Sequence, residues 1–128
     1  MNARKLMTLG ALALVSHLAM AATPKAFSQQ EFDSLNRAGK PVVVDVSAVW
    51  CPTCKAQKPI VESLAGKPAY QDVTVLRVDF DSEKPVLKEF SVASQSTLIA
   101  FKGGKETARS VGDTTPAGIQ GLFDKAAK

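Results

Sequence analysis

The chain has 128 residues, of which 45% are apolar and 22% charged, and its formal net charge is +4. This length suits one domain, and the apolar fraction excludes a disordered chain. The presence of only two cysteines and one histidine excludes a disulfide-dense scaffold and a Cys₂His₂ zinc finger.

Residues 1–21 have the pattern of a secretory signal peptide. Arg4 and Lys5 precede an uncharged apolar run over 6–20, and the run ends in small residues that suit a cleavage site. The alternative is an uncleaved membrane anchor, but the run is shorter than the ~20 residues that cross a bilayer. We therefore expect cleavage after Ala21, a periplasmic location and one mature domain over 22–128.

Loss of this leader would change which chemistry the chain offers. His17 is the only histidine, so the mature domain has no serine triad, Cys–His protease site or histidine metal site. The remaining Lys and Arg residues alternate with acidic residues and form no basic run. We therefore expect no nucleic-acid partner.

The mature chain alternates predicted helices and strands. The expected order is helix 28–38, strand 41–47, helix 51–65, strand 73–80, helix 84–90, strands 97–102 and 105–111, and a helix from 116 onward. Ser28 and Thr115 are expected helix caps, Asp81 or Ser82 should open helix 84–90, and Gly103-Gly104 predicts a hairpin. This alternation predicts an α/β fold of three layers, α/β/α, around a mixed sheet of about four strands. Crossovers should pair the strands in parallel, and the hairpin should add an antiparallel edge.

The two cysteines carry the chemistry of the chain. Cys51 and Cys54 are separated by Pro52 and Thr53, at the point where a buried strand gives way to a helix. A helix N-terminus favours negative charge, which biases the first thiol toward the thiolate, the nucleophile of disulfide exchange. We therefore expect Cys51 to attack a substrate disulfide and Cys54 to resolve the mixed disulfide.

Two other interpretations of the cysteine pair are a static disulfide and half of a metal site. A disulfide loop this short removes little chain entropy and stabilises poorly. A metal would need a dimer, oxygen ligands or exogenous thiols, because the mature chain has no further Cys or His. The spacing favours a redox-active pair that works without a metal or other cofactor.

The stretch 43–55, VVDVSAVWCPTCK, resembles the active-site segment of thioredoxins. The buried Asp45, Trp50 before the first cysteine, Lys55 after the second and the helix proline Pro59 all stand in the family's places, and 90–104 resembles the family's last hairpin segment. The resemblance extends from about Lys25 to the C-terminus. It implies a thioredoxin-like fold and a protein thiol–disulfide oxidoreductase that acts on protein disulfides and thiols.

The resemblance also implies roles for residues around the cysteines. Asp45 would be a buried acid with a raised pKa that moves protons for Cys54, and Arg77 would replace the family's usual lysine partner of that acid. The alternatives are an Asp45 that points to solvent from a frayed strand end and a solvent-facing Arg77. Trp50 would flank the substrate groove, although it also suits the core.

Two departures from the family pattern affect the groove, which would comprise Trp50, Pro52, Thr53, Gln95 and Ser96. Ser96 stands where thioredoxins have a cis-proline. A cis bond before serine costs about 3 kcal/mol, so we expect a trans or locally strained Gln95–Ser96 bond. The replacement of proline by Ser96 therefore puts peptide binding, redox potential and the exclusion of metal in question. One hypothesis is that Ser96 allows a metal or cluster to be bridged between two chains.

The second departure is the Pro52-Thr53 dipeptide between the cysteines, in place of Gly-Pro. The dipeptide tunes thiolate stability, and the Thr53 hydroxyl is a candidate donor to the Cys51 sulfur.

The expected function is an exported, monomeric thiol–disulfide oxidoreductase that acts as a reductant. Asp45 and the lack of an inserted helical domain favour reductant over oxidant. The export signal implies electrons from another protein, such as a membrane thiol relay. The alternatives are a non-catalytic binding or chaperone module of thioredoxin fold and a thiol-based metal-handling protein.

Overall fold

The computed structural model describes Gly10 and residues 23–128, so the expected signal peptide lies outside the described residues apart from Gly10. The elements are β1 (Lys25–Ala26), α1 (Gln29–Arg37), β2 (Val42–Ser47), α2 (Pro52–Ala65), the 3₁₀ turn η1 (Pro68–Tyr70), β3 (Thr74–Asp79), α3 (Lys84–Glu89), β4 (Thr97–Lys102), β5 (Lys105–Val111) and α4 (Pro116–Ala127). Within this part of the chain, no helix is long and apolar enough to cross a membrane.

The sheet is mixed and has five strands in the order β1-β3-β2-β4-β5. β1 and β2 run parallel to β3, whereas β4 runs antiparallel to both β2 and β5. The predicted count of about four strands omitted β1. The expectation that β4 would pair in parallel with its neighbour across the sheet was wrong. The six-residue α3 is about 9 Å long, too short to return the chain along a strand of about 20 Å. β4 therefore starts at the sheet edge where β2 and β3 end.

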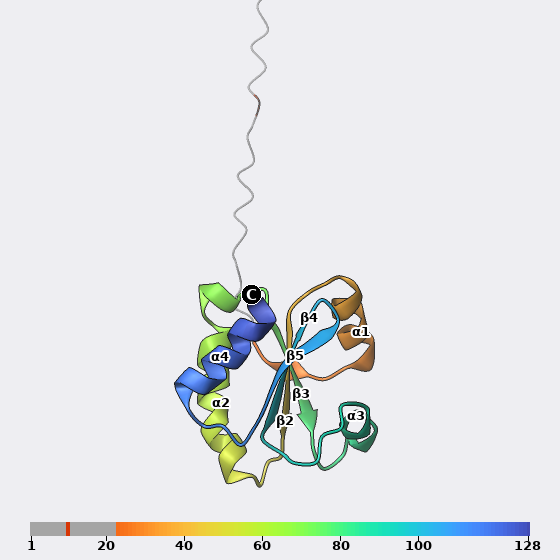
Figure 1. Cartoon of the computed structure of the whole chain (residues 1–128), viewed down its shortest axis with the longest axis vertical. Helices are drawn as coiled ribbons and strands as arrows, with labels where there is room; N and C mark the ends of the chain where they lie inside the picture. Colours follow the sequence, from red (N-terminus) through yellow and green to blue (C-terminus); the bar gives the residue numbers. More distant parts are fainter. Residues whose placement is uncertain (1–9, 11–22) are drawn as a thin grey trace, which may run out of the picture.

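Helices cover both faces of the sheet and give the three predicted layers (Figure 1). α2 and α4 lie on one face and α1 and α3 on the other. The odd-numbered side chains Val43 and Val75 pack with α2 and α4 in one core cluster. The even-numbered Val44 and Leu76 pack with Phe32 of α1 and Leu87 of α3 in the other. This alternation follows from the two-residue period of a strand.

Two helix caps predicted from the sequence, Ser28 and Thr115, are present in the structure. Ser28 Oγ accepts from the Glu31 N–H at 3.3 Å, and Thr115 Oγ1 accepts from the Gly118 N–H at 3.2 Å. The start of α3 differs from the prediction, because its N-cap is Glu83, which makes no side-chain cap. Ser82 instead donates its hydroxyl to Asp79, at 2.8 Å, in the turn after β3.

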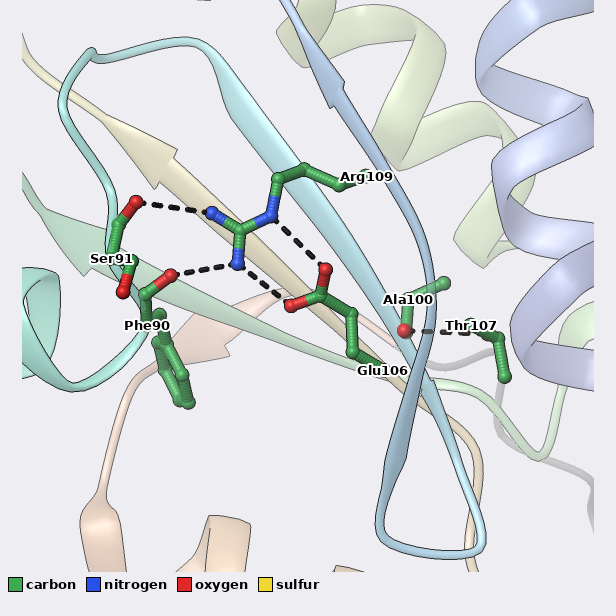
Figure 2. Close-up of polar contacts among 6 residues, drawn as sticks. All are labelled: Phe90, Ser91, Ala100, Glu106, Thr107 and Arg109. Carbon is green, nitrogen blue, oxygen red and sulfur yellow. Dashed lines mark hydrogen bonds and ion pairs between the residues drawn. The ribbon is translucent and has the colours of Figure 1, made fainter.

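Arg109 on β5 fastens the outer strand to the segment that follows α3 (Figure 2). Its guanidinium donates to the carbonyls of Phe90 at 2.7 Å and Ser91 at 3.3 Å, and forms an ion pair with Glu106 at 2.7 Å. Ser91 has a φ of 53°, in the left-handed region that side chains disfavour. Arg109 therefore holds the strained start of the loop that leads to Ser96.

Candidate active site

The two cysteines lie where β2 gives way to α2, at the edge of the sheet where β4 begins. Cys51 is the N-cap of α2, and its sulfur takes the place of the usual capping oxygen by accepting from the Cys54 N–H at 3.2 Å. Pro52 follows at the first helical position, where its missing N–H costs nothing. The local sequence thus aims an N–H donor of a helix N-terminus at the Cys51 sulfur.

A single hydroxyl group lies between the two sulfurs. Ser96 Oγ is 3.2 Å from Cys51 Sγ and 3.1 Å from Cys54 Sγ, and both cysteines are free thiols. Cys51 is 1% exposed, Cys54 7% and Ser96 3%. The sequence placed Ser96 in the substrate groove, but its side chain points inward to the sulfurs.

The surroundings separate the pKa values of the two thiols. Burial acts to raise the pKa of Cys51, but hydrogen bonds from the Cys54 thiol, the Ser96 hydroxyl and the backbone of Cys54 and Thr53 outweigh it and lower the pKa. Burial and the hydrogen bond with Cys51 raise the pKa of Cys54. The pair therefore favours a thiolate at Cys51 and a neutral thiol at Cys54. No hydrogen bond joins the Thr53 hydroxyl to the Cys51 sulfur within residues 23–128, contrary to the expectation.

Asp45 is buried in β2 and paired with Arg77 of β3. Asp45 is 4% exposed, and Arg77 Nε donates to Asp45 Oδ2 at 3.3 Å. The two residues are directly paired in the register of β2 and β3. Arg77 is shared, because its Nη1 also reaches Glu62 Oε1 of α2 at 3.5 Å. Burial raises the pKa of Asp45, and the attraction of Arg77 only partly offsets this. The interpretation of Asp45 as a solvent-facing residue is therefore wrong.

A cavity connects the buried acid with the second cysteine. It has a volume of about 330 Å³, and its lining includes Asp45, Cys54, Lys55 and Arg77. The charged side chains in its lining and its size leave room for water between the carboxyl and the thiol. Asp45 and Cys54 thus share one solvent-accessible space on the α2 side of the sheet.

Gln57 is a site residue that the sequence analysis missed. It is 1% exposed, one turn beyond Cys54 on α2, and its Nε2 donates to the carbonyls of Ser96 at 3.2 Å and Asp113 at 2.8 Å. The only sequence signal was a polar residue three positions after Cys54, on the same helix face. Gln57 fixes the backbone of Ser96 beneath the cysteines.

The surface around the cysteines carries the other predicted groove residues. Trp50 is 54% exposed, which rules out a core position, and its Nε1 donates to Asp81 Oδ2 at 2.8 Å. Pro52 is exposed, and Thr53 and Gln95 are half-buried. Farther along α2, Lys55 and Pro59 are also exposed, and the helix runs through Pro59 without a break.

The Gln95–Ser96 bond is trans, since the described residues contain no cis peptide bond, and Ser96 adopts a φ of 63°. The expectation of a trans or strained bond is confirmed. In the same part of the chain, no group of three or more His, Cys, Asp or Glu side chains is arranged to hold a metal ion.

Comparisons with known proteins agree with this geometry. The thioredoxin family model matches residues 23–125. The chain is 45% identical over 85 residues to a thioredoxin of Chlamydia trachomatis, covering 66% of this chain and 80% of that one. It is 42% identical over 94 residues to thioredoxin-2 of Saccharomyces cerevisiae, covering 73% and 88%. The crystal structure of Trxlp from Edwardsiella tarda aligns with a TM-score of 0.76 and 38% identity, over 83% of this chain and 100% of that one. The chain therefore belongs to the thioredoxin family of protein thiol–disulfide oxidoreductases.

Proposed function

We propose that this protein is an exported reductant of protein disulfides that uses Cys51 as nucleophile and Cys54 as resolving thiol. The observation that carries the assignment of roles is the asymmetry of the two thiols. Cys51 accepts a hydrogen bond from a helix N–H and has a lowered pKa, whereas the pKa of Cys54 is raised. The thiolate is the attacking species in disulfide exchange, so attack begins at Cys51.

The reaction would proceed in two exchanges. The Cys51 thiolate attacks one sulfur of a substrate disulfide, forms a mixed disulfide and releases the other substrate sulfur as a thiolate. Cys54 then attacks Cys51 Sγ, the Cys51–Cys54 bond forms, and the second substrate sulfur leaves with the bonding electron pair. Two electrons pass to the substrate, and the protein is left as its disulfide.

Asp45 would receive the proton that Cys54 loses during the second exchange. The two groups line the same cavity, so water there can carry the proton between them. The raised pKa of Asp45 suits a base that must hold this proton for a time and then release it. Arg77 would position the carboxylate and limit the rise of its pKa.

Protein substrates would dock over the exposed apolar surface beside Cys51. Val49 is 89% exposed and Trp50 54% exposed, and both directly precede the nucleophile. Within the described part of the chain, neither the N–H nor the carbonyl of half-buried Gln95 makes a backbone hydrogen bond. This loop would therefore offer main-chain hydrogen bonds to an extended substrate segment, in the manner of an added strand.

A disulfide reduction assay on insulin tests the proposed roles. The domain over residues 22–128 should reduce insulin with dithiothreitol as electron source, and both Cys51→Ser and Cys54→Ser should abolish the acceleration. Cys54→Ser should also accumulate a mixed disulfide with substrate, whereas Cys51→Ser should not. An inactive wild-type protein, or trapping by the Cys51→Ser variant alone, would contradict the proposal.

Export, electron supply and oligomeric state form part of the same proposal. The pattern of residues 1–21 supports cleavage after Ala21 and a periplasmic location. There the protein would act as a monomer and receive electrons from a membrane thiol relay. Cell fractionation and the mass of the purified protein test the location and the cleavage site, and a full-length protein retained in the cytoplasm would contradict both.

A further inference from the structure

Ser96 stands out because its buried hydroxyl touches both reacting sulfurs. Its Oγ is 3.2 Å from Cys51 Sγ and 3.1 Å from Cys54 Sγ, and it has no other hydrogen-bond partner among residues 23–128. A hydroxyl carries one hydrogen and two lone pairs, so it can donate to one sulfur while it accepts from the other. With a thiolate at Cys51 and a thiol at Cys54, one arrangement satisfies all three groups. The Ser96 O–H donates to the Cys51 sulfur, and the single Cys54 S–H is shared between Ser96 Oγ and the Cys51 sulfur.

The backbone holds the hydroxyl in this place. The Ser96 N–H donates to the Val46 carbonyl at 2.8 Å, and the Ser96 carbonyl accepts from the Gly112 N–H at 3.0 Å and from Gln57 Nε2 at 3.2 Å. These contacts come from β2, from the segment after β5 and from α2. Together they hold a φ of 63°, which costs free energy in a residue other than glycine. The geometry of Ser96 is thus imposed by three separate elements.

We propose that the Ser96 hydroxyl selectively stabilises the reduced cysteine pair and so makes the protein a weaker reductant than the same site without this hydroxyl. This inference rests on the proposed redox cycle of Cys51 and Cys54. In that cycle, oxidation removes two electrons from the sulfurs and the proton from Cys54, and leaves a neutral disulfide. A thiolate is a strong hydrogen-bond acceptor and a disulfide a poor one, so oxidation leaves the buried hydroxyl without a good partner.

The Ser96 hydrogen bond to Cys51 stabilises the thiolate, and it therefore both lowers the pKa of Cys51 and favours the reduced form of the pair. Ser96 contributes to the lowered pKa of Cys51, alongside the opposing effect of burial and the hydrogen bonds from Cys54. Loss of the hydroxyl should raise the pKa of Cys51 and slow its reaction near neutral pH. It should also shift the equilibrium between dithiol and disulfide toward the disulfide, since the reduced form loses a charge-assisted hydrogen bond.

The test compares the redox equilibrium of the wild-type domain with those of Ser96→Ala and Ser96→Gly in glutathione buffers. Both variants remove the hydroxyl, while glycine also relieves the left-handed backbone, so Ser96→Gly serves where Ser96→Ala folds poorly. We expect the disulfide to become about tenfold harder to reduce, a potential about 30 mV more negative. The ultraviolet absorbance of the thiolate should show a higher pKa for Cys51 in both variants.

Thr97→Val is the matched control. Thr97 is the next residue, 1% exposed, and its hydroxyl donates to the Ser94 carbonyl at 2.7 Å and touches neither sulfur. The potential of this variant should equal that of the wild type. Equal potentials in the wild type, Ser96→Ala and Ser96→Gly would overturn the inference, as would an equal shift in Thr97→Val. The glutathione equilibrium needs no protein substrate, so failure of the insulin assay would overturn the proposed function and not this one.

Discussion

The buried carboxyl of Asp45 should destabilise the folded protein at neutral pH. Asp45 is 4% exposed, and among residues 23–128 its one ion-pair partner is Arg77, whose Nε lies 3.3 Å away and whose guanidinium also pairs with Glu62. Asp45→Asn keeps the shape of the side chain and removes the charge. Arg77 has a side chain 25% exposed to solvent and retains Glu62, so the variant leaves no isolated buried charge.

The sign of the effect follows from the raised pKa of Asp45. The folded state holds the proton more tightly than the unfolded state, so the carboxyl is neutral in both states only at low pH. As pH rises through the folded-state pKa, the wild type loses stability relative to Asp45→Asn, and the difference levels off above that pKa. Burying a polar group with incomplete compensation costs on the order of 1–3 kcal/mol, and we expect the variant to be more stable at neutral pH by about this amount.

Urea unfolding of the oxidised proteins at a series of pH values measures this difference without interference from titrating thiols. The stability curves of wild type and Asp45→Asn should converge at acid pH and separate as pH increases. Parallel curves, or a less stable Asp45→Asn at neutral pH, would refute the reasoning. In the insulin assay the same variant should slow turnover, because Cys54 would lose its proton acceptor.

Three further substitutions test other parts of the structure. Gln57→Leu should lower the free energy of unfolding by about 1–3 kcal/mol in urea titrations, because the part-buried Asp113 carbonyl loses the Gln57 donor and the buried Ser96 carbonyl loses one of its two donors; an unchanged stability would show that these contacts are dispensable. Arg109→Lys should cost about 1–2 kcal/mol in the same measurement, since lysine cannot reproduce the fork that binds Phe90, Ser91 and Glu106, and a fully stable variant would contradict this role. Trp50→Ala should raise KM for insulin and leave the reaction with a small aromatic disulfide unchanged, because only a macromolecular substrate would extend over the exposed Trp50 side chain beside Cys51; equal effects on both substrates would argue against docking.

Features set by neighbouring residues were readable from the sequence. The caps at Ser28 and Thr115 and the strands on either side of Gly103-Gly104 match the structure, because a cap or a tight hairpin depends on residues a few positions apart. The cysteine pair was also readable, since its spacing and its place at a helix start carry the chemistry directly.

Features that depend on distant segments were not readable in the same way. β1 has only two residues and exists through its pairing with β3, so it left no pattern in the sequence. The direction of β4 followed from the short α3, which leaves the chain at the same edge of the sheet. The resemblance to thioredoxins suggested the partnership of Asp45 with Arg77, 32 residues away, but only the strand register placed the two side by side.

By itself, the sequence determined the fold class, the redox pair and the order of helices and strands from α1 onward, because these follow from local periodicity and from the identity of two residues. The tertiary structure decided what surrounds the sulfurs. Ser96 reaches them across 45 and 42 positions of chain, and Gln57 reaches Ser96 across 39. Hydrogen bonds and burial set the acidity of a thiol, and the burial and the Ser96 hydrogen bonds arise only when these distant segments pack together.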